Sequence, residues 1–340
     1  MIPKVKVALV GLGRAGGFHL RSLSQHPGVV LKYIVDPAIS RDNQLLAAHP
    51  GVVILPDLEP VLNDAEVDAV VVASPTPFHF DHITSALQAK KHVFSEKPLG
   101  QSLKDIKLIY QLARDNHCAL FLGFQRRYDH NFQVLKSKLA QLGEVKLYRA
   151  SSRDHPKPAI EYLKISGNIF HDMLIHDFDM LVYLLGSQPP ESIVAIGHAH
   201  DPEIANIPDY DHVMVTLKYA SGTICSIDTS RFASYGYDQR VEVFGESGMI
   251  TAQIQSDHTV EVWDQQGAHQ APINYSFPQR YRQSYQLEIE DFIQGIFNKQ
   301  LHNISEEACV LSHLIAEAAF ESCQQNQVVG FNKFVPDLSN

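Results

Sequence analysis

A carboxylate and an imidazole stand four residues apart in an apolar stretch near the middle of this 340-residue chain. Asp172 and His176 lie in residues 167–179, GNIFHDMLIHDFD. The spacing predicts that both side chains share one face of a helix, one turn apart, and the apolar neighbours predict that this helix is buried. Buried ionisable groups need a charged or hydroxylated partner. An imidazole with an ordinary pKa of about 6.5 suits proton transfer near neutral pH.

The first glycine cluster predicts a dinucleotide site. Gly11, Gly13 and Gly16 form G-x-G-x-x-G between an apolar strand pattern and a helical pattern. Such a motif provides a tight turn, a close approach of the backbone to a pyrophosphate, and close packing of helix on strand. Asp36 ends the second strand pattern 20 residues after Gly16. A carboxylate there binds ribose hydroxyls and favours NAD over NADP.

Other interpretations of this region stay open. Arg41 is near enough to accommodate a 2′-phosphate, and Asp36 could be only a turn residue before Pro37. Thr76 follows the fourth strand pattern and could simply cap a helix opened by Pro77. The predicted cofactor-binding residues are Gly11, Leu12, Gly13, Arg14, Ala15, Gly16, Asp36, Ser74, Thr76, His79, Glu96 and Lys97.

A lysine follows the fifth strand pattern, in Ser95-Glu96-Lys97-Pro98. In doubly wound sheets, ligands bind at the carboxyl ends of the strands. We therefore expect Lys97 to lie in the same crevice as the nicotinamide. A solvated surface lysine before a turn is the alternative.

These residues need a framework, and the first 124 residues alternate short apolar runs with helical patterns. That rhythm predicts a parallel, doubly wound sheet whose strands are buried on both faces. The expected strands are 5–10, 30–35, 52–55, 69–73, 92–94 and 120–124. The expected helices are 15–26, 58–63, 77–89 and 103–116.

After residue 124 the rhythm changes, and short turns join successive strand patterns, which makes those strands antiparallel. The expected strands are 193–198, 212–219, 223–229, 240–244, 249–254 and 259–263, and the expected helices are 132–142, 170–185, 286–297 and 305–324. The fold class is therefore α/β. We expect a Rossmann domain with a doubly wound parallel sheet over residues 1–124. Residues 125–340 are expected to form an α+β domain with an open, mostly antiparallel sheet, for substrate binding and oligomerisation.

Composition excludes several classes of protein. The net charge of −10 and the lack of any lysine or arginine run argue against a nucleic-acid partner. No apolar run reaches the roughly 18 residues of a membrane span, and no signal peptide precedes the first strand pattern. Four cysteines without C-x-x-C spacing suit a reducing compartment. We expect a cytoplasmic protein without a membrane or nucleic-acid partner.

Together the motifs resemble the Gfo/Idh/MocA oxidoreductases. The glycine-rich loop, Glu96-Lys97-Pro98, and Gly167 followed by Asp172-x-x-x-His176-x-x-Asp179 occur in that family's order over nearly the whole chain. Within the family, residues 123–129 (GFQRRYD) and 235–240 (YGYDQR) are similar to segments of inositol dehydrogenases.

The chain departs from that inositol group at two positions. Asn168 stands where a second glycine is usual, and His171 stands where a basic residue is common. These departures leave the exact substrate open, while Lys97, Asp172 and His176 are intact.

The resemblance implies an NAD-dependent dehydrogenase that oxidises one secondary hydroxyl of a cyclitol and assembles as a homotetramer. Such a reaction needs a hydride acceptor, supplied by the cofactor, and a group that removes the hydroxyl proton. We expect His176 to act as general base, Lys97 to stabilise the developing alkoxide, and Asp172 to bind an adjacent hydroxyl. The expected substrate contacts are Arg127, Asp154, Asp172, His176 and Tyr235.

Four alternatives remain. The substrate could be scyllo-inositol or an aldose, or the protein could be a dinucleotide-binding regulator without turnover. A phosphorylated substrate could use the basic residues Arg126, Arg127, Arg153, Lys157 and Lys164. A metal site could use His171, Asp172, His176 and Asp179. Adjacent helical residues diverge by about 100°, so His171 and Asp172 would not share a face, and no metal is expected.

The strand expected at 212–219 bears on assembly. Val213, Val215 and Leu217 would face one side of the sheet, and Met214 and Thr216 the other. One face is expected to pack on helices. The other is expected to pack on a partner subunit.

Overall fold

The computed structural model describes residues 4–39 and 43–335. The chain divides into two compact units. Unit 1 comprises Met1–Tyr128 and Gln283–Val310, and unit 2 comprises Asp129–Arg282 and Leu311–Asn340. The sequence patterns gave no sign that a late segment returns to the first unit, and the domain division after residue 124 stays a prediction.

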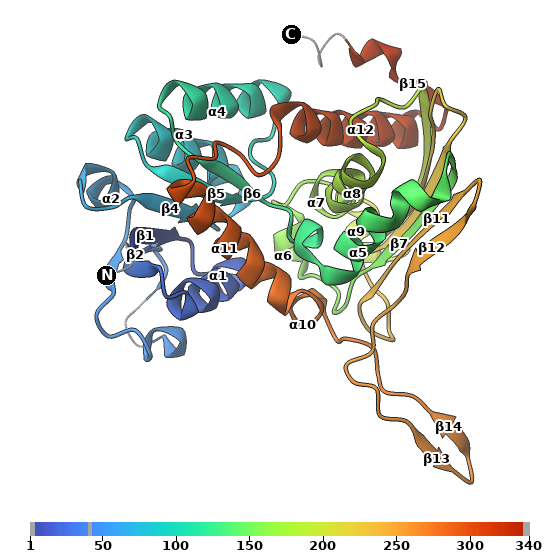
Figure 1. Cartoon of the computed structure of the whole chain (residues 1–340), viewed down its shortest axis with the longest axis horizontal. Helices are drawn as coiled ribbons and strands as arrows, with labels where there is room; N and C mark the ends of the chain where they lie inside the picture. Colours follow the sequence, from blue (N-terminus) through green and yellow to red (C-terminus); the bar gives the residue numbers. More distant parts are fainter. Residues whose placement is uncertain (1–3, 40–42, 336–340) are drawn as a thin grey trace. The chain divides into compact units, whose positions relative to one another are not determined.

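Unit 1 is built on a six-stranded parallel sheet in the order β3-β2-β1-β4-β5-β6 (Figure 1). The order reverses between β1 and β4, the point at which such sheets bind ligands. Helices α1 and α11 cover one face, and α3 and α4 cover the other. The strands are β1 Val5–Val10, β2 Val29–Val35, β3 Val53–Leu55, β4 Ala69–Val72, β5 His92–Glu96 and β6 Leu120–Gly123. The helices are α1 Arg14–Gln25, α2 Glu59–Asn63, α3 His79–Gln88, α4 Leu103–Asp115 and α11 Arg282–Phe297.

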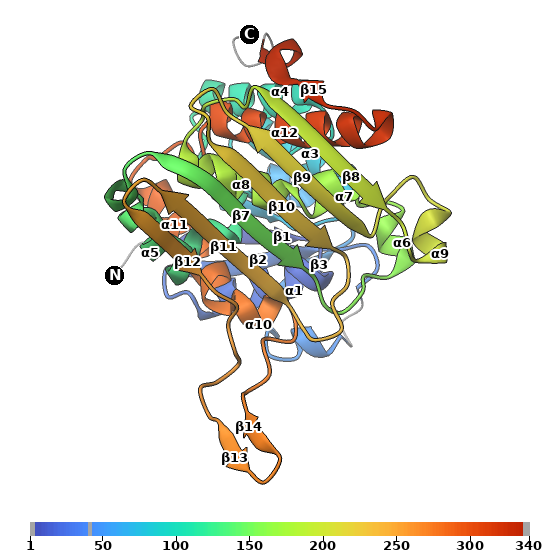
Figure 2. The same cartoon turned by 90° about the vertical axis from the view of Figure 1, so that its right-hand side faces the viewer.

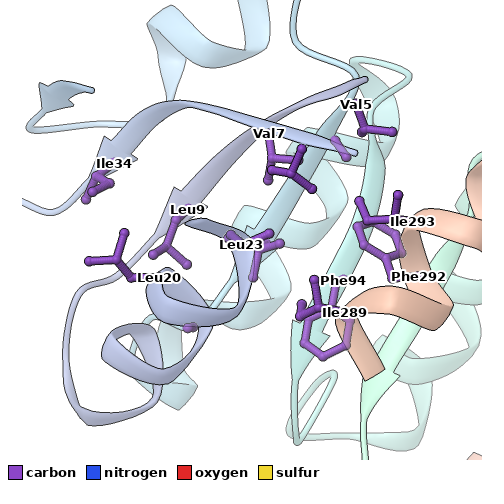
Figure 3. Close-up of a cluster of buried hydrophobic side chains, with 14 of the residues drawn as sticks. Val5, Val7, Leu9, Leu20, Leu23, Ile34, Phe94, Ile289, Phe292 and Ile293 are labelled. Atoms are coloured by element: carbon purple, nitrogen blue, oxygen red, sulfur yellow. The ribbon is translucent and has the colours of Figure 1, made fainter. Parts of the chain in front are cut away.

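The core of unit 1 explains why α11 returns to it. Figure 3 shows Ile289, Phe292 and Ile293 of α11 among side chains of the central strands. The Phe292 ring lies 5.8 Å from that of Phe94 and 5.5 Å from that of Phe121, both on the parallel sheet. Burial of these apolar side chains, worth about 1.5–3 kcal/mol each, stabilises α11 on the sheet.

Unit 2 is built on a seven-stranded sheet in the order β12-β11-β7-β10-β9-β8-β15, which faces the viewer in Figure 2. Its neighbours are antiparallel except for β7 and β10, so the sheet is mixed. The strands are β7 Val145–Arg153, β8 Ser192–His198, β9 His212–Lys218, β10 Ile224–Ser230, β11 Asp238–Gly245, β12 Gly248–Ala252 and β15 Val329–Gly330. The helices are α5 His130–Lys138, α6 Ile160–Leu163, α7 Ile169–Asp172, α8 Ile175–Leu185, α9 Pro202–Ala205 and α10 Phe277–Arg280, and α12 Glu306–Gln325 begins within unit 1.

Two expectations for this sheet were wrong. Strand β7 was not predicted, although it is an interior strand of the sheet, between β10 and β11. The strand expected at 259–263 does not join the sheet; β13 (Val262–Asp264) pairs only with β14 (Gly267–His269) in a separate hairpin. All residues of that hairpin are exposed, so no buried face holds it on the main sheet.

Other expectations for unit 2 hold. Along β9, Val213, Val215 and Leu217 are buried while Met214 and Thr216 are exposed. Ser305 caps α12, because the Ala308 N–H donates to Ser305 Oγ at 3.2 Å. Within the part of the chain that the structure describes, every helix is too short or too polar to cross a bilayer.

Candidate active site

The glycine motif links β1 to α1. Gly11 has φ +87°, and a Cβ there would lie 2.6 Å from the Ala73 carbonyl oxygen. A Cβ on Gly16 would lie 2.1 Å from the Gly11 carbonyl oxygen. At Gly13, the N-cap of α1, a Cβ would meet no atom of the described residues within 4 Å. Gly11 and Gly16 therefore serve the turn and the helix–strand packing, and Gly13 leaves open space at the helix N-terminus.

Asp36 lies directly after β2, next to this loop. Its Oδ2 accepts a hydrogen bond from the Leu12 N–H at 2.8 Å, and its Oδ1 accepts one from the Ala38 N–H at 2.9 Å. The carboxylate is thus held beside the glycine turn. The first turn of α1 contains no acidic residue, and its N-cap residue Gly13 makes no side-chain cap. An open, uncapped helix N-terminus beside a fixed carboxylate fits the pyrophosphate and ribose of NAD. Arg41 lies outside the described residues.

In the loop after β4, some of the predicted cofactor-binding residues make hydrogen bonds within the protein. His79 is buried, with Nδ1 2.7 Å from the Pro98 carbonyl oxygen and Nε2 2.7 Å from that of Ser74. Burial lowers the pKa of His79, although the two carbonyl acceptors oppose that shift. The Ser74 hydroxyl lies 3.0 Å from His82 Nδ1. No side-chain cap is present where Thr76 begins its 3-10 turn. Cofactor contacts by these residues stay predictions.

Lys97 directly follows β5, at the carboxyl end of that strand, and is half-buried. Glu96 is the last residue of β5, and its Oε1 lies 2.7 Å from Nε2 of His19 in α1. Arg127, in the 3-10 turn Gln125–Tyr128, is also half-buried. All of these residues belong to unit 1.

Unit 2 holds Asp172 in a network of side chains. Asp172 is buried, and its Oδ1 accepts a hydrogen bond from the Tyr162 hydroxyl at 2.7 Å. Its Oδ2 accepts one from Arg231 Nη1 at 3.1 Å. Arg231 Nη2 also donates to Asp209 Oδ2 at 2.7 Å, and Asp209 Oδ1 accepts from the Ile169 N–H at 2.7 Å. One buried guanidinium therefore joins two buried carboxylates.

The pKa shifts of this network follow from burial and charge. Burial opposes the charge of Arg231, but the two carboxylates outweigh it and raise the pKa of Arg231. Burial of the Tyr162 hydroxyl, and next the negative charge of Asp172, raise the pKa of Tyr162. The hydroxyl therefore keeps its proton and donates a hydrogen bond to Asp172. Burial raises the pKa of Asp209, although the positive charge of Arg231 opposes this shift.

The sequence analysis did not identify Tyr162, Asp209 or Arg231 as site residues, because each is a single residue without a local motif.

The predicted single helix over 170–185 is wrong, because α7 ends at Asp172 and α8 begins at Ile175. The Leu174 N–H donates to the Ile169 carbonyl five residues back, and the His176 N–H donates to the Met173 carbonyl three residues back. These bonds interrupt the four-residue ladder. Asp172 and His176 therefore flank a helix break instead of sharing one continuous face. His176 is half-buried near the start of α8.

His171 has a structural environment. Its Nδ1 lies 2.9 Å from Asn168 Oδ1 and its Nε2 lies 3.0 Å from Glu317 Oε1. Asn168 also caps α7, accepting from the N–H groups of Phe170 and His171. The proposed metal set of His171, Asp172, His176 and Asp179 is not among the close groups of potential ligands within the described residues.

The remaining predicted substrate contacts lie near β7 and β11. The Tyr235 hydroxyl donates to Asp238 Oδ2 at 2.7 Å and accepts from Arg153 Nη1 at 3.0 Å. Asp154 Oδ1 accepts from the His155 N–H at 2.8 Å. Arg153 donates through Nε to Asp228 Oδ2 at 2.8 Å.

Three of the five basic residues considered for a phosphate have acidic partners in unit 2. Lys157 contacts Asp201 at 2.5 Å, and Lys164 contacts Glu161 at 2.8 Å. Arg153 likewise pairs with Asp228. Each of these three basic side chains therefore already has a carboxylate partner.

Comparisons with known proteins agree with the geometry of both units. Residues 5–124 match the profile described as "Oxidoreductase family, NAD-binding Rossmann fold" of GFO_IDH_MocA, and residues 136–331 match that family's C-terminal alpha/beta domain. The chain belongs to the Gfo/Idh/MocA oxidoreductase family. It is an NAD-binding oxidoreductase, the class of enzyme that the resemblance implied.

Several members of the family are similar over nearly their whole length. The chain is 34% identical to myo-inositol 2-dehydrogenase of Thermotoga maritima, over 97% of this chain and 100% of that protein. It is 35% identical to inositol 2-dehydrogenase of Rhizobium meliloti, over 86% and 88% of the two chains. A structure of scyllo-inositol dehydrogenase from Lactobacillus casei with bound NAD(H) and scyllo-inositol superposes with a TM-score of 0.88 at 27% identity, over 97% and 99%.

Proposed function

We propose that this protein oxidises myo-inositol to the 2-keto-inositol with NAD⁺, with His176 as general base. The observation that carries the proposal is the Asp172 carboxylate fixed by Arg231 and the Tyr162 hydroxyl, four residues before His176. A fixed carboxylate and an imidazole four residues apart in the chain would suit a polyol, whose adjacent hydroxyls need an acceptor and a base. Relatives named as inositol dehydrogenases support the substrate class.

The cofactor supplies the hydride acceptor when bound. The residues that would hold it are the backbone of Gly11–Gly16 for the pyrophosphate and Asp36 for the ribose hydroxyls. A 2′-phosphate would face the Asp36 carboxylate, which favours NAD⁺ over NADP⁺.

The side chains of the chain handle the proton and the orientation of the substrate. His176 accepts the hydroxyl proton at an imidazole nitrogen. Lys97, in unit 1, donates a hydrogen bond to the same oxygen and stabilises its developing negative charge. Asp172 accepts a hydrogen bond from an adjacent hydroxyl, which selects a vicinal polyol over a simple alcohol. The meeting of Lys97 with Asp172 and His176 at one substrate is part of the proposal.

A substrate panel tests the proposal. Purified protein is given NAD⁺ or NADP⁺ with myo-inositol, scyllo-inositol and aldoses, and the absorbance of reduced nicotinamide is followed. We expect the highest kcat/KM with myo-inositol and NAD⁺. Turnover of scyllo-inositol or an aldose alone would move the protein to another substrate of this family. Tight NAD binding with no turnover of any polyol would instead favour a non-catalytic regulator, and a preference for NADP⁺ would overturn the role of Asp36.

The base is tested by substitution of His176. We expect His176→Ala to lower kcat by about 10²–10⁴-fold and to leave NAD⁺ affinity unchanged. His130→Ala, an exposed histidine of the same unit, is the matched control and should keep wild-type turnover. Full turnover by His176→Ala would be incompatible with its role as base.

Lys97 is tested in the same assay. If it acts on the developing alkoxide, Lys97→Ala should lower kcat while NAD⁺ affinity stays near wild type. The exposed Lys104 of unit 1 provides the control Lys104→Ala. A loss confined to NAD⁺ affinity would assign Lys97 to cofactor binding alone.

A further inference from the structure

Three titratable side chains come together in unit 1 outside the proposed catalytic triad. They are His19 of α1, Glu96 at the end of β5, and Glu288 of α11. One ligand atom of each lies within 4.8 Å of the others. His19 and Glu288 are 0% exposed, and the Glu96 side chain is 14% exposed. None of these side chains has a role in the proposed proton transfer, although Glu96 is among the predicted cofactor-binding residues.

Glu96 is the charged member of this cluster. Burial opposes its ionisation, but the hydrogen bond from His19 Nε2 and the nearby positive charges outweigh burial and lower the pKa of Glu96. The charged or titratable groups that face Glu96 are His19 from α1, His79 from α3, Glu288 from α11 and the adjacent Lys97.

Glu288 is the member that needs an explanation. Neither of its carboxyl oxygens has a hydrogen-bond partner among the described residues. An ionised carboxylate in such a place is very unfavourable. Burial, and then the negative charge of Glu96, raise the pKa of Glu288 well above its usual range. Burial without a partner thus favours the protonated form of Glu288, and an apolar residue would fill the same space without the cost of a buried polar group.

We propose that Glu288, as a neutral acid, acts with His19 to position Glu96 and thereby Lys97. The inference rests on the role proposed above for Lys97. Helix α1 begins at the glycine motif, and β5 ends one residue before Lys97. The His19–Glu96 hydrogen bond joins these two elements, so it sets the lysine relative to the nucleotide helix. The protonated Glu288 packs against this bond from α11 and adds no second negative charge beside the lysine.

The kinetic test compares three variants of the full-length protein with NAD⁺ and myo-inositol. A small misplacement of a reacting group can cost about 10²-fold in rate, so we expect Glu288→Ala to lower kcat substantially at unchanged KM for NAD⁺. Glu288→Gln, which is neutral and of the same shape, should recover most of that loss. The exposed Glu307 of unit 1 provides the control Glu307→Gln. Equal losses in Glu288→Gln and Glu288→Ala would contradict a neutral acid.

A stability measurement separates the neutral acid from an ionised metal ligand. Because the pKa of Glu288 is raised in the folded protein, its contribution to stability is full below the ordinary glutamate pKa and is lost as pH rises above it. Glutamine does not titrate. The Tm of Glu288→Gln relative to wild type should therefore increase from about pH 5 to about pH 8. A Glu288→Gln variant less stable at every pH, with loss of a stoichiometric metal found in wild type by mass spectrometry, would replace the proposal with a cation site.

The two proposals fail separately. If Lys97→Ala keeps full kcat, the role of the lysine fails. If Lys97→Ala loses kcat while Glu288→Ala keeps it, only the positioning role of Glu288 fails.

Discussion

Arg231 illustrates how a single residue can hold the site of unit 2 together. Its guanidinium joins Asp172 and Asp209, all three being buried. A guanidinium presents two donor edges in a rigid plane, so it can fix two carboxylates at once. The orientation of Asp172 toward a polyol therefore depends on a residue 59 positions away in the chain.

Removal of Arg231 should be costly. We expect Arg231→Met to reduce the free energy of unfolding by about 3–5 kcal/mol, because two buried carboxylates lose their countercharge. Denaturant unfolding checks this value. The exposed pair of Arg149 with Glu242, 3.6 Å apart, provides the control. Arg149→Met should cost no more than about 1 kcal/mol, and equal costs for the two variants would contradict the account of the buried network.

Residues with a local motif were predictable from the sequence, and residues without one were not. Gly11, Gly13, Gly16 and Asp36 stand at spacings that a dinucleotide imposes on one βαβ unit, and the structure places them around one turn. Arg231 was not predictable, because its partners come from separate segments and nothing in its own neighbourhood marks the contact.

At the scale of elements, two features lay beyond local patterns. Strand β7 alternates buried Tyr148, Ala150 and Ser152 with more exposed residues, so it lacks the continuous apolar run that marked the strands of unit 1. The break between α7 and α8 depends on the backbone bonds of Leu174 and His176. The apolar periodicity of the sequence continues from α7 into α8, and for that reason it predicted one continuous helix.

The glycine turn of α1 gives a prediction at this scale. We expect Gly16→Ala to destabilise the protein by roughly 1–3 kcal/mol, because its Cβ would lie 2.1 Å from the Gly11 carbonyl oxygen. Gly13→Ala should change stability by about 1 kcal/mol or less but should weaken NAD⁺ binding, since the methyl group stands where the pyrophosphate approaches. Thermal unfolding and NAD⁺ titration check the pair. A stable Gly16→Ala variant would contradict the packing argument.

At the scale of the whole molecule, the mixed sheet of unit 2 presents an exposed outer face, toward the viewer in Figure 2. Apolar side chains exposed on this sheet are Ile196, Met214, Ile224, Phe244 and Met249. Ile196 and Met214 are directly opposite on β8 and β9. Exposed apolar surface of this kind is typical of an interface, and we propose that a second copy of the chain covers it.

Light scattering tests this assembly. We expect a homotetramer for the wild-type protein and a smaller species for Met214→Glu, because the interface would bury an unpaired carboxylate. Lys104→Glu changes the charge of an exposed position in unit 1 and should leave the tetramer intact. A monomeric wild-type protein would overturn the proposed interface.

The central claim is that the hydrogen on the carbinol carbon passes to the nicotinamide, and isotope transfer measures this step directly. Myo-inositol deuterated at the 2-carbon is incubated with NAD⁺ and the protein, and the reduced cofactor is analysed by mass spectrometry and NMR. The account predicts one deuterium at the nicotinamide 4-position and almost no labelled product with His176→Ala in the same time. Reduced cofactor without deuterium, or no reduced cofactor from a protein that binds NAD⁺, would contradict it.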